Sequence, residues 1–130
     1  MKSSSFETLG LSHHINTRLN ELGITNPTPI QMEVIPMILN QSNDIVALAG
    51  TGTGKTAAFG LPIIDQLTPQ KKPQVLVVTP TRELCMQVCN DAYVYVSAKG
   101  RGHNRQKVVI QYACAPDNCQ KPDPEVSPAA

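Results

Sequence analysis

The stretch "AGTGTGKTAAF", Ala49–Phe59, places glycines, threonines and one lysine between an apolar run and a run of helix-forming residues. The apolar run before it, "DIVALA" at Asp44–Ala49, predicts a buried strand. A helix is predicted from about Gly54 to Leu67. A strand, a glycine-rich loop and a helix in this order form a phosphate cradle, because glycine lets backbone N–H groups converge and the helix start adds its positive end.

The candidate phosphate-binding residues are those of the loop. Lys55 would place its charge at the terminal phosphates, and the Thr56 hydroxyl would ligate Mg²⁺. The alternative is a flexible turn with an incidental lysine, which the preceding strand and the Gly-Lys-Thr ending disfavour. The sequence therefore predicts a nucleotide with Mg²⁺ as ligand, held by Ala49, Gly50, Thr51, Gly52, Thr53, Gly54, Lys55 and Thr56.

The remaining chain alternates helical and apolar strand-like segments. Helices are predicted over 12–22, 28–40 and 81–96, and further strands over 74–79 and 107–112. This alternation predicts an α/β fold with a parallel sheet flanked by helices. Residues 113–130 are rich in proline and poor in large apolar residues, so we expect one domain over 1–112 and an irregular or disordered tail.

Composition limits the partners. The chain has 130 residues and a formal net charge of +1, so no bulk positive field announces nucleic-acid binding. No apolar run is long enough to span a membrane, and no signal peptide is visible. The cysteines are therefore expected to be free thiols of a cytoplasmic protein. Cys85 and Cys89 lie four residues apart, which is not the usual zinc-knuckle spacing, so buried thiols are the favoured interpretation.

Three stretches together resemble the DEAD-box ATP-dependent RNA helicases. "AGTGTGKT" is similar to their motif I, "GITNPTPIQ" at Gly23–Gln31 to their Q motif, and "PTREL" at Pro80–Leu84 to their motif Ia. The stretches follow the family's order over roughly Phe6 to Val96. The resemblance implies a partial RecA-like P-loop NTPase domain, with a Q motif over 4–32 and ATP as cofactor.

The resemblance also implies roles for single residues. Gln31 would read adenine, because its side-chain amide offers one donor and one acceptor. Phe6 would stack on the base, and Thr25 or Thr28 would steady the loop. The bland alternatives are a solvated Gln31 and a Phe6 that only fills the core, and stacking and core filling are compatible.

For RNA, the resemblance implies that Thr81 and Arg82 contact phosphates at a helix start. Their alternative roles are a helix N-cap and a surface charge. RNA is therefore an expected partner, bound weakly through Pro80–Leu84.

The family's Asp-Glu-Ala-Asp and Ser-Ala-Thr motifs and its second RecA-like domain do not occur in the 130 residues. We therefore expect no catalytic residue within this chain. Three hypotheses stay open: the N-terminal portion of a helicase that unwinds or remodels RNA, a nucleotide- or RNA-binding module without turnover, and a non-functional fragment. An uncovered sheet edge predicts self-association.

Overall fold

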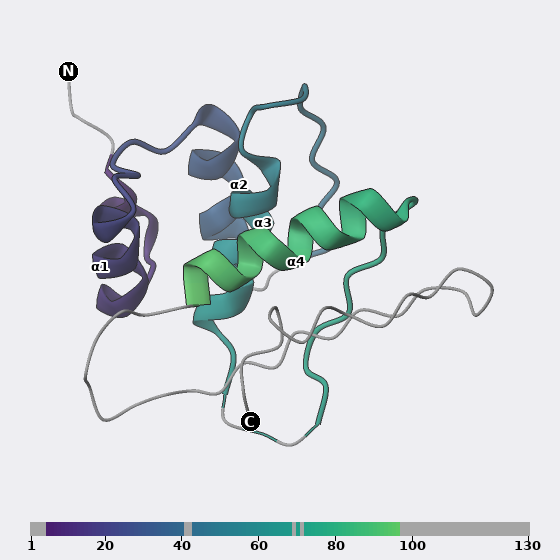
Figure 1. The fold of residues 1–130 in the computed structure, drawn as a ribbon. Helices are drawn as coiled ribbons and strands as arrows, with labels where there is room; N and C mark the ends of the chain where they lie inside the picture. The colour runs from purple at the N-terminus through teal and green to yellow at the C-terminus, as the bar shows by residue number, and fades with distance from the viewer. Residues whose placement is uncertain (1–4, 41–42, 69, 71, 97–130) are drawn as a thin grey trace.

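The computed structural model describes residues 5–40, 43–68, 70 and 72–96. Its elements are a short 3₁₀ helix, η1 at Phe6–Leu9, and four α-helices. These are α1 at His13–Glu21, α2 at Pro29–Asn40, α3 at Lys55–Asp65 and α4 at Arg82–Val96. Helix α3 packs against both α2 and α4, while η1 contacts α1 and α2 (Figure 1). No helix in the described part is both long and apolar enough to cross a membrane.

Helix α1 has the ends that its sequence predicts. The Ser12 hydroxyl accepts a hydrogen bond from the Ile15 N–H at 3.4 Å and caps the first turn. At the other end Gly23 adopts φ +73°, and the Gly23 and Ile24 N–H groups bond back to the carbonyls of Asn20 and Leu19. These two bonds form a Schellman motif, in which glycine carries the left-handed turn. The predicted helix over 12–22 is therefore confirmed, within one residue at each end.

The core is small and lies where η1, α1, α2 and α3 meet. Leu19, Ile35 and Leu61 are the largest apolar side chains that are almost completely covered, at 1%, 0% and 0% exposure. Phe6 and Ile15 complete the cluster from η1 and α1. Full burial of one such side chain stabilises a fold by about 1.5–3 kcal/mol. The core therefore packs the middle of α2 against the middle of α3.

Two polar contacts tie α1 to the other helices. The Ser12 N–H donates to Asp65 Oδ2 at 2.9 Å, which places a carboxylate from the end of α3 at the start of α1. Arg18 donates through Nε and Nη2 to the carbonyl oxygen of Val94, at 3.0 and 2.9 Å. A carboxylate at the start of a helix and a guanidinium at the end of a helix both interact favourably with the helix dipole. Neither long-range contact is visible in the sequence pattern.

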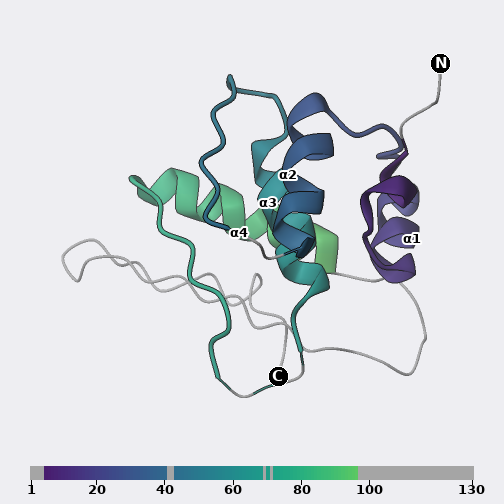
Figure 2. The ribbon, with the colours of Figure 1, turned by 180° about the vertical axis from the view of Figure 1, so that it is seen from behind.

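The two segments predicted as buried strands have no assigned secondary structure and are mostly exposed, and none of the described residues is assigned to a strand. Val46 and Leu48 are 89% and 90% exposed, and Leu76 and Val78 are 86% and 83% exposed. The expectation of burial is wrong for these side chains. A buried strand needs paired neighbours and covered faces, and the described residues supply neither. Figure 2 shows both segments running outside the group of helices. The predicted strand over 107–112 and the tail over 113–130 lie outside the described residues.

Replacing Gly60 by alanine should stabilise the chain. Gly60 lies inside α3, and a Cβ built there has no neighbouring heavy atom within 4 Å. The free energy of unfolding should rise by about 0.5–1 kcal/mol, because alanine lowers the entropy cost of the helix. Urea unfolding followed by circular dichroism measures this change. A loss of stability would mean that this face of α3 is covered in solution.

The exposed apolar side chains should make the chain associate. Val46, Leu48, Leu76 and Val78 expose apolar side chains on two segments without assigned strand pairing, which favours pairing with another chain. The double variant Val46→Lys, Leu48→Lys should shift the chain toward monomer in size-exclusion chromatography with light scattering. Met37→Lys, at an exposed apolar position on α2, is the control and should leave the distribution unchanged. A monomeric unmodified chain would contradict the expectation.

Candidate functional site

The glycine-rich loop is built on two left-handed glycines. Gly52 has φ +73° and Gly54 has φ +83°, a backbone region that side-chain-bearing residues rarely adopt. Gly50 is different: its φ is not positive, and an added Cβ would only reach ordinary contact with Thr53 Cγ2 at 3.9 Å. The Thr53 hydroxyl donates to the Gly50 carbonyl at 2.7 Å and closes the turn. The loop geometry therefore requires glycine at positions 52 and 54, whereas position 50 could carry a side chain.

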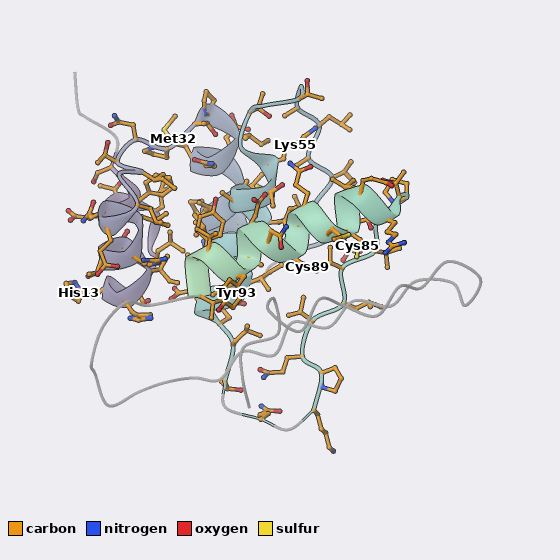
Figure 3. The ribbon with its side chains drawn as sticks, viewed as in Figure 1. His13, Met32, Lys55, Cys85, Cys89 and Tyr93 are labelled. Carbon is orange, nitrogen blue, oxygen red and sulfur yellow. The ribbon has the colours of Figure 1, made fainter. Side chains whose placement is uncertain are left out.

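Lys55 is the first residue of α3 and lies beside this loop (Figure 3). Its Nζ donates to the carbonyl oxygen of Ala49 at 2.6 Å, and its side chain is otherwise exposed. The ammonium group therefore lies across the mouth of the loop, bonded to the residue that begins it. An anion entering the loop would meet this cation together with the N–H groups at the start of α3.

Gln31 joins the start of α2 to the same loop. Its side chain is 5% exposed. Its Oε1 accepts from the Thr28 N–H at 2.9 Å, and its Nε2 donates to the Gly54 carbonyl at 3.1 Å. The first bond is half of a capping box, in which a glutamine three residues into a helix returns to the N-cap N–H. The second bond connects two motifs that lie 23 residues apart in the chain.

The contact between Gln31 and Gly54 leaves no room for a side chain at position 54. A Cβ at position 54 would collide with Gln31 Nε2 and lie 3.3 Å from the Thr28 hydroxyl oxygen. That hydroxyl oxygen is buried and has no hydrogen-bond partner among the described residues. Two independent features therefore require glycine at position 54: its positive φ and the close approach of the Gln31 side chain.

Phe6 lies at a separate hollow of about 240 Å³ between η1, α1 and the loop before α2. Phe6 is only 4% exposed and also belongs to the core, so it fills the core as well as lining the hollow. Neither Gln31 nor the glycine-rich loop lines this hollow. The residues around it are Ser5, Phe6, Glu7, Asn16, Leu19, Asn20, Thr25 and Asn26.

Asn16 is a lining residue that the sequence analysis missed. Its side chain is 9% exposed, and Nδ2 donates to the Leu11 carbonyl at 3.0 Å. Its Oδ1 is buried and has no partner among the described residues. The available signal was a polar residue directly after Ile15, next to the apolar stripe of a predicted helix.

The predicted RNA-binding residues lie at the start of α4. The Thr81 hydroxyl oxygen accepts from the Leu84 N–H at 3.3 Å, and the Thr81 carbonyl accepts from the Cys85 N–H at 3.1 Å. Thr81 is therefore the N-cap of α4, and its hydroxyl proton still has donor capacity. Arg82 follows it in the first turn, half-buried. Thr81 therefore is an N-cap, as the alternative role predicted. Its hydroxyl proton can still donate to a phosphate, so capping and a phosphate contact are compatible.

Cys85 and Cys89 occupy successive turns of α4 as free, half-buried thiols (Figure 3). Burial, and secondarily the neighbouring Cys85, raise the pKa of the Cys89 thiol above its usual value. Cys89 therefore keeps its proton at neutral pH, in agreement with the interpretation as packed thiols. Within the described residues no group of three or more histidine, cysteine, aspartate or glutamate side chains could hold a metal ion.

The comparisons with known proteins agree with the motifs. The family model described as DEAD/DEAH box helicase matches residues 28–116. The chain is 45% identical over 108 residues to the DEAD-box ATP-dependent RNA helicase RhpA of Helicobacter pylori. It is 48% identical over 102 residues to the ATP-dependent RNA helicase DeaD of Escherichia coli. These alignments cover 83% and 78% of the chain but only 21% and 16% of the two relatives.

Solved structures give the same relationship. A DEAD box protein from Methanococcus jannaschii matches 70% of the chain with a TM-score of 0.67 at 41% identity, and the match covers 25% of that protein. Saccharomyces cerevisiae Dbp5 bound to RNA and ADP BeF3 matches 70% of the chain with a TM-score of 0.65 at 31% identity, covering 24% of Dbp5. These neighbours are RecA-like helicase domains. The chain therefore belongs to the DEAD/DEAH box helicase family.

Alanine at Gly54 should destabilise the chain more than alanine at Gly52. Both positions have positive φ, so both variants carry the same kind of backbone strain. Only Gly54→Ala also displaces Gln31, since a Cβ at Gly52 meets nothing within 4 Å. The displaced, buried amide should cost a further ~1–3 kcal/mol in the free energy of unfolding. Urea titrations of the two variants, read against the unmodified chain, measure the difference. Equal losses would show that the Gln31–Gly54 contact contributes nothing.

Proposed function

We propose that the chain is the nucleotide-binding portion of an ATP-dependent RNA helicase and binds ATP with Mg²⁺ at the loop Ala49–Thr56. The observation that carries the proposal is the bond from Gln31 to Gly54, which joins the Q motif to the phosphate loop. The residues fit the ligand: two left-handed glycines shape the loop, and the exposed ammonium group of Lys55 lies beside the N–H groups at the start of α3. Family membership and the ADP BeF3 bound by Dbp5 support the same assignment.

Lys55, Thr56 and Gln31 have distinct roles in this proposal. Lys55 exchanges the Ala49 carbonyl for the terminal phosphates, and the first N–H groups of α3 bond the phosphate oxygens. The Thr56 hydroxyl provides an oxygen ligand for Mg²⁺, which neutralises phosphate charge when bound. Gln31 retains one unused N–H and one unused lone pair after its two internal bonds, which are the donor and acceptor that adenine requires. Gln31 does not line the hollow beside Phe6, so its contact with a base in that hollow requires the residues between them to rearrange.

The hollow beside Phe6 is the proposed position of the adenine ring. Its volume of about 240 Å³ is below the ~300–1,000 Å³ of sites for drug-sized ligands, so it suits a single base better than a whole nucleotide. An aromatic wall at Phe6 and a rim at Thr25 and Asn26 are available to the ring.

RNA is the proposed partner of the start of α4. The capped helix end offers N–H groups, and Arg82 adds a guanidinium in the first turn. Helix α4 packs on α3, so this RNA contact and the phosphate loop lie on neighbouring helices. The RNA bound to Dbp5 supports the same partner class.

We further propose that residues 44–49 and 74–79 are strands of a parallel sheet flanked by helices, as expected for a RecA-like domain. Their apolar sequences, bounded by polar residues, and the family membership of the chain support this assignment. A cytoplasmic location and self-association through these segments stay predictions.

Lys55→Ala should weaken ATP binding at least ~10-fold while leaving adenosine binding unchanged. Lys55 meets only phosphates in the proposed complex, and loss of one charge-assisted contact costs about 1.5–3 kcal/mol. The fold should persist, because this side chain is exposed and bonded only to Ala49. Isothermal titration calorimetry with ATP and with adenosine measures both effects.

Lys72→Ala is the matched control for Lys55→Ala, because it removes an exposed lysine outside every motif. It should leave both affinities unchanged. A Lys55→Ala variant that loses adenosine as strongly as ATP, or that unfolds, would place Lys55 outside the phosphate site.

Arg82→Ala should lower RNA affinity and reduce its salt dependence. A single phosphate contact to single-stranded RNA changes the slope of log K against log salt by about 0.7. Fluorescence anisotropy with a labelled single-stranded RNA at several salt concentrations gives the slope. An unchanged slope would leave Arg82 as a surface charge of α4.

A further inference from the structure

The described residues contain two buried polar side chains, Gln31 and Asn16, at 5% and 9% exposure. They differ in how well they are satisfied. Gln31 uses both ends of its amide, with Thr28 and Gly54 as partners. Asn16 uses only Nδ2, and its Oδ1 is left without a partner. A buried acceptor without a donor costs free energy, so a structure that retains one invites a ligand that supplies the donor.

The Leu11 carbonyl fixes which end of the Asn16 amide is unused. Nδ2 donates to that carbonyl at 3.0 Å. Rotating the amide by half a turn would bring Oδ1 against the Leu11 oxygen, and two acceptors repel each other. Asn16 therefore keeps Oδ1 as an unused acceptor, beside the second N–H of Nδ2. A group that bonds to Oδ1 must carry a hydrogen-bond donor.

Asn16 lines the same hollow as Phe6. The hollow thus combines an aromatic wall with one buried acceptor of fixed orientation. Asn16 Oδ1 has almost no exposed surface, so a base can contact it only after a small shift of the residues that line the hollow. Asn20 and Asn26 are exposed lining residues and can move without disturbing the core.

We propose that Asn16 Oδ1 accepts a hydrogen bond from the exocyclic amino group of an adenine placed against Phe6, and so makes Asn16 a specificity-determining residue for the base. This inference rests on the proposed nucleotide-binding function. It places a base contact on α1, distinct from the one expected from Gln31, which does not line the hollow.

The selectivity follows from the substituent at purine C6. Adenine carries an amino group there and can donate to Oδ1. Hypoxanthine and guanine carry a carbonyl oxygen, which would set two acceptors against each other. Unsubstituted purine offers only hydrogen and loses the bond without repulsion. One neutral hydrogen bond corresponds to about 2- to 10-fold in affinity.

The test compares ATP, purine riboside triphosphate and inosine triphosphate on the 130-residue chain, by competition against a fluorescent ATP analogue. The unmodified chain should prefer ATP over purine riboside triphosphate by about 3- to 10-fold, and inosine triphosphate should bind weakest. In Asn16→Leu, which keeps a similar side-chain volume, the preference for ATP over purine riboside triphosphate should fall by about 2- to 10-fold, and any preference that remains is the contact expected from Gln31. His14→Leu, at an exposed position of α1, should keep the preference of the unmodified chain.

Loss of the Leu11 bond could unfold Asn16→Leu, so a second measurement uses the unmodified chain. The side-chain NH₂ resonances of Asn16 should shift in NMR spectra on binding ATP and shift much less on binding purine riboside triphosphate. An unchanged ATP preference in folded Asn16→Leu, or resonances that respond equally to both nucleotides, would overturn the proposal. So would a preference that disappears in Asn20→Leu instead.

The outcomes separate this inference from the function on which it rests. Equal binding of ATP and purine riboside triphosphate, both weakened by Lys55→Ala, would remove the role of Asn16 and leave the phosphate site intact. Failure of the unmodified chain to bind any of the three nucleotides would remove both.

Discussion

The hydrogen bond from Gln31 Nε2 to the Gly54 carbonyl is the constraint on which the site depends. A buried primary amide must satisfy its donor and its acceptor, or the fold loses about 1–3 kcal/mol. Gln31 meets that demand only when the start of α2 and the start of α3 lie side by side. The same bond therefore determines the packing of the two helices and the position of the glycine-rich loop. Gly54 permits it, since any side chain at that position would collide with Gln31.

Around this contact the chain arranges two different environments. One is the loop at the start of α3, where backbone N–H groups and the exposed Lys55 side chain bring positive charge together. The other is the hollow beside Phe6, where one aromatic side chain lies among mostly polar residues, including Asn16 with its unsatisfied oxygen. A nucleotide has the matching division, with charged phosphates at one end and a flat, weakly polar base at the other.

The helices could be predicted from the sequence because their signals are local. Ser12 and Gly23 bound α1, and Thr28-Pro29 opens α2 where the pattern indicates. The strands could not be predicted to the same level, because burial of Val46 or Leu76 depends on neighbours distant in the chain. For the site, the loop residues and Gln31 were found through motif spacing. Their mutual contact, the role of Asp65 at α1 and the unsatisfied oxygen of Asn16 arise only from tertiary packing.

Amide hydrogen exchange at the glycine-rich loop, with and without ATP and Mg²⁺, tests the central claim most directly. The claim is that the loop binds phosphates and that Gln31 holds it in the binding geometry. In the unmodified chain, ATP should slow exchange of the N–H groups of Gly52, Gly54, Lys55 and Thr56. In Gln31→Ala, helix α3 should persist and this protection should be lost or greatly reduced. Protection that is as strong in Gln31→Ala, or that appears elsewhere and not at these four groups, would contradict the account.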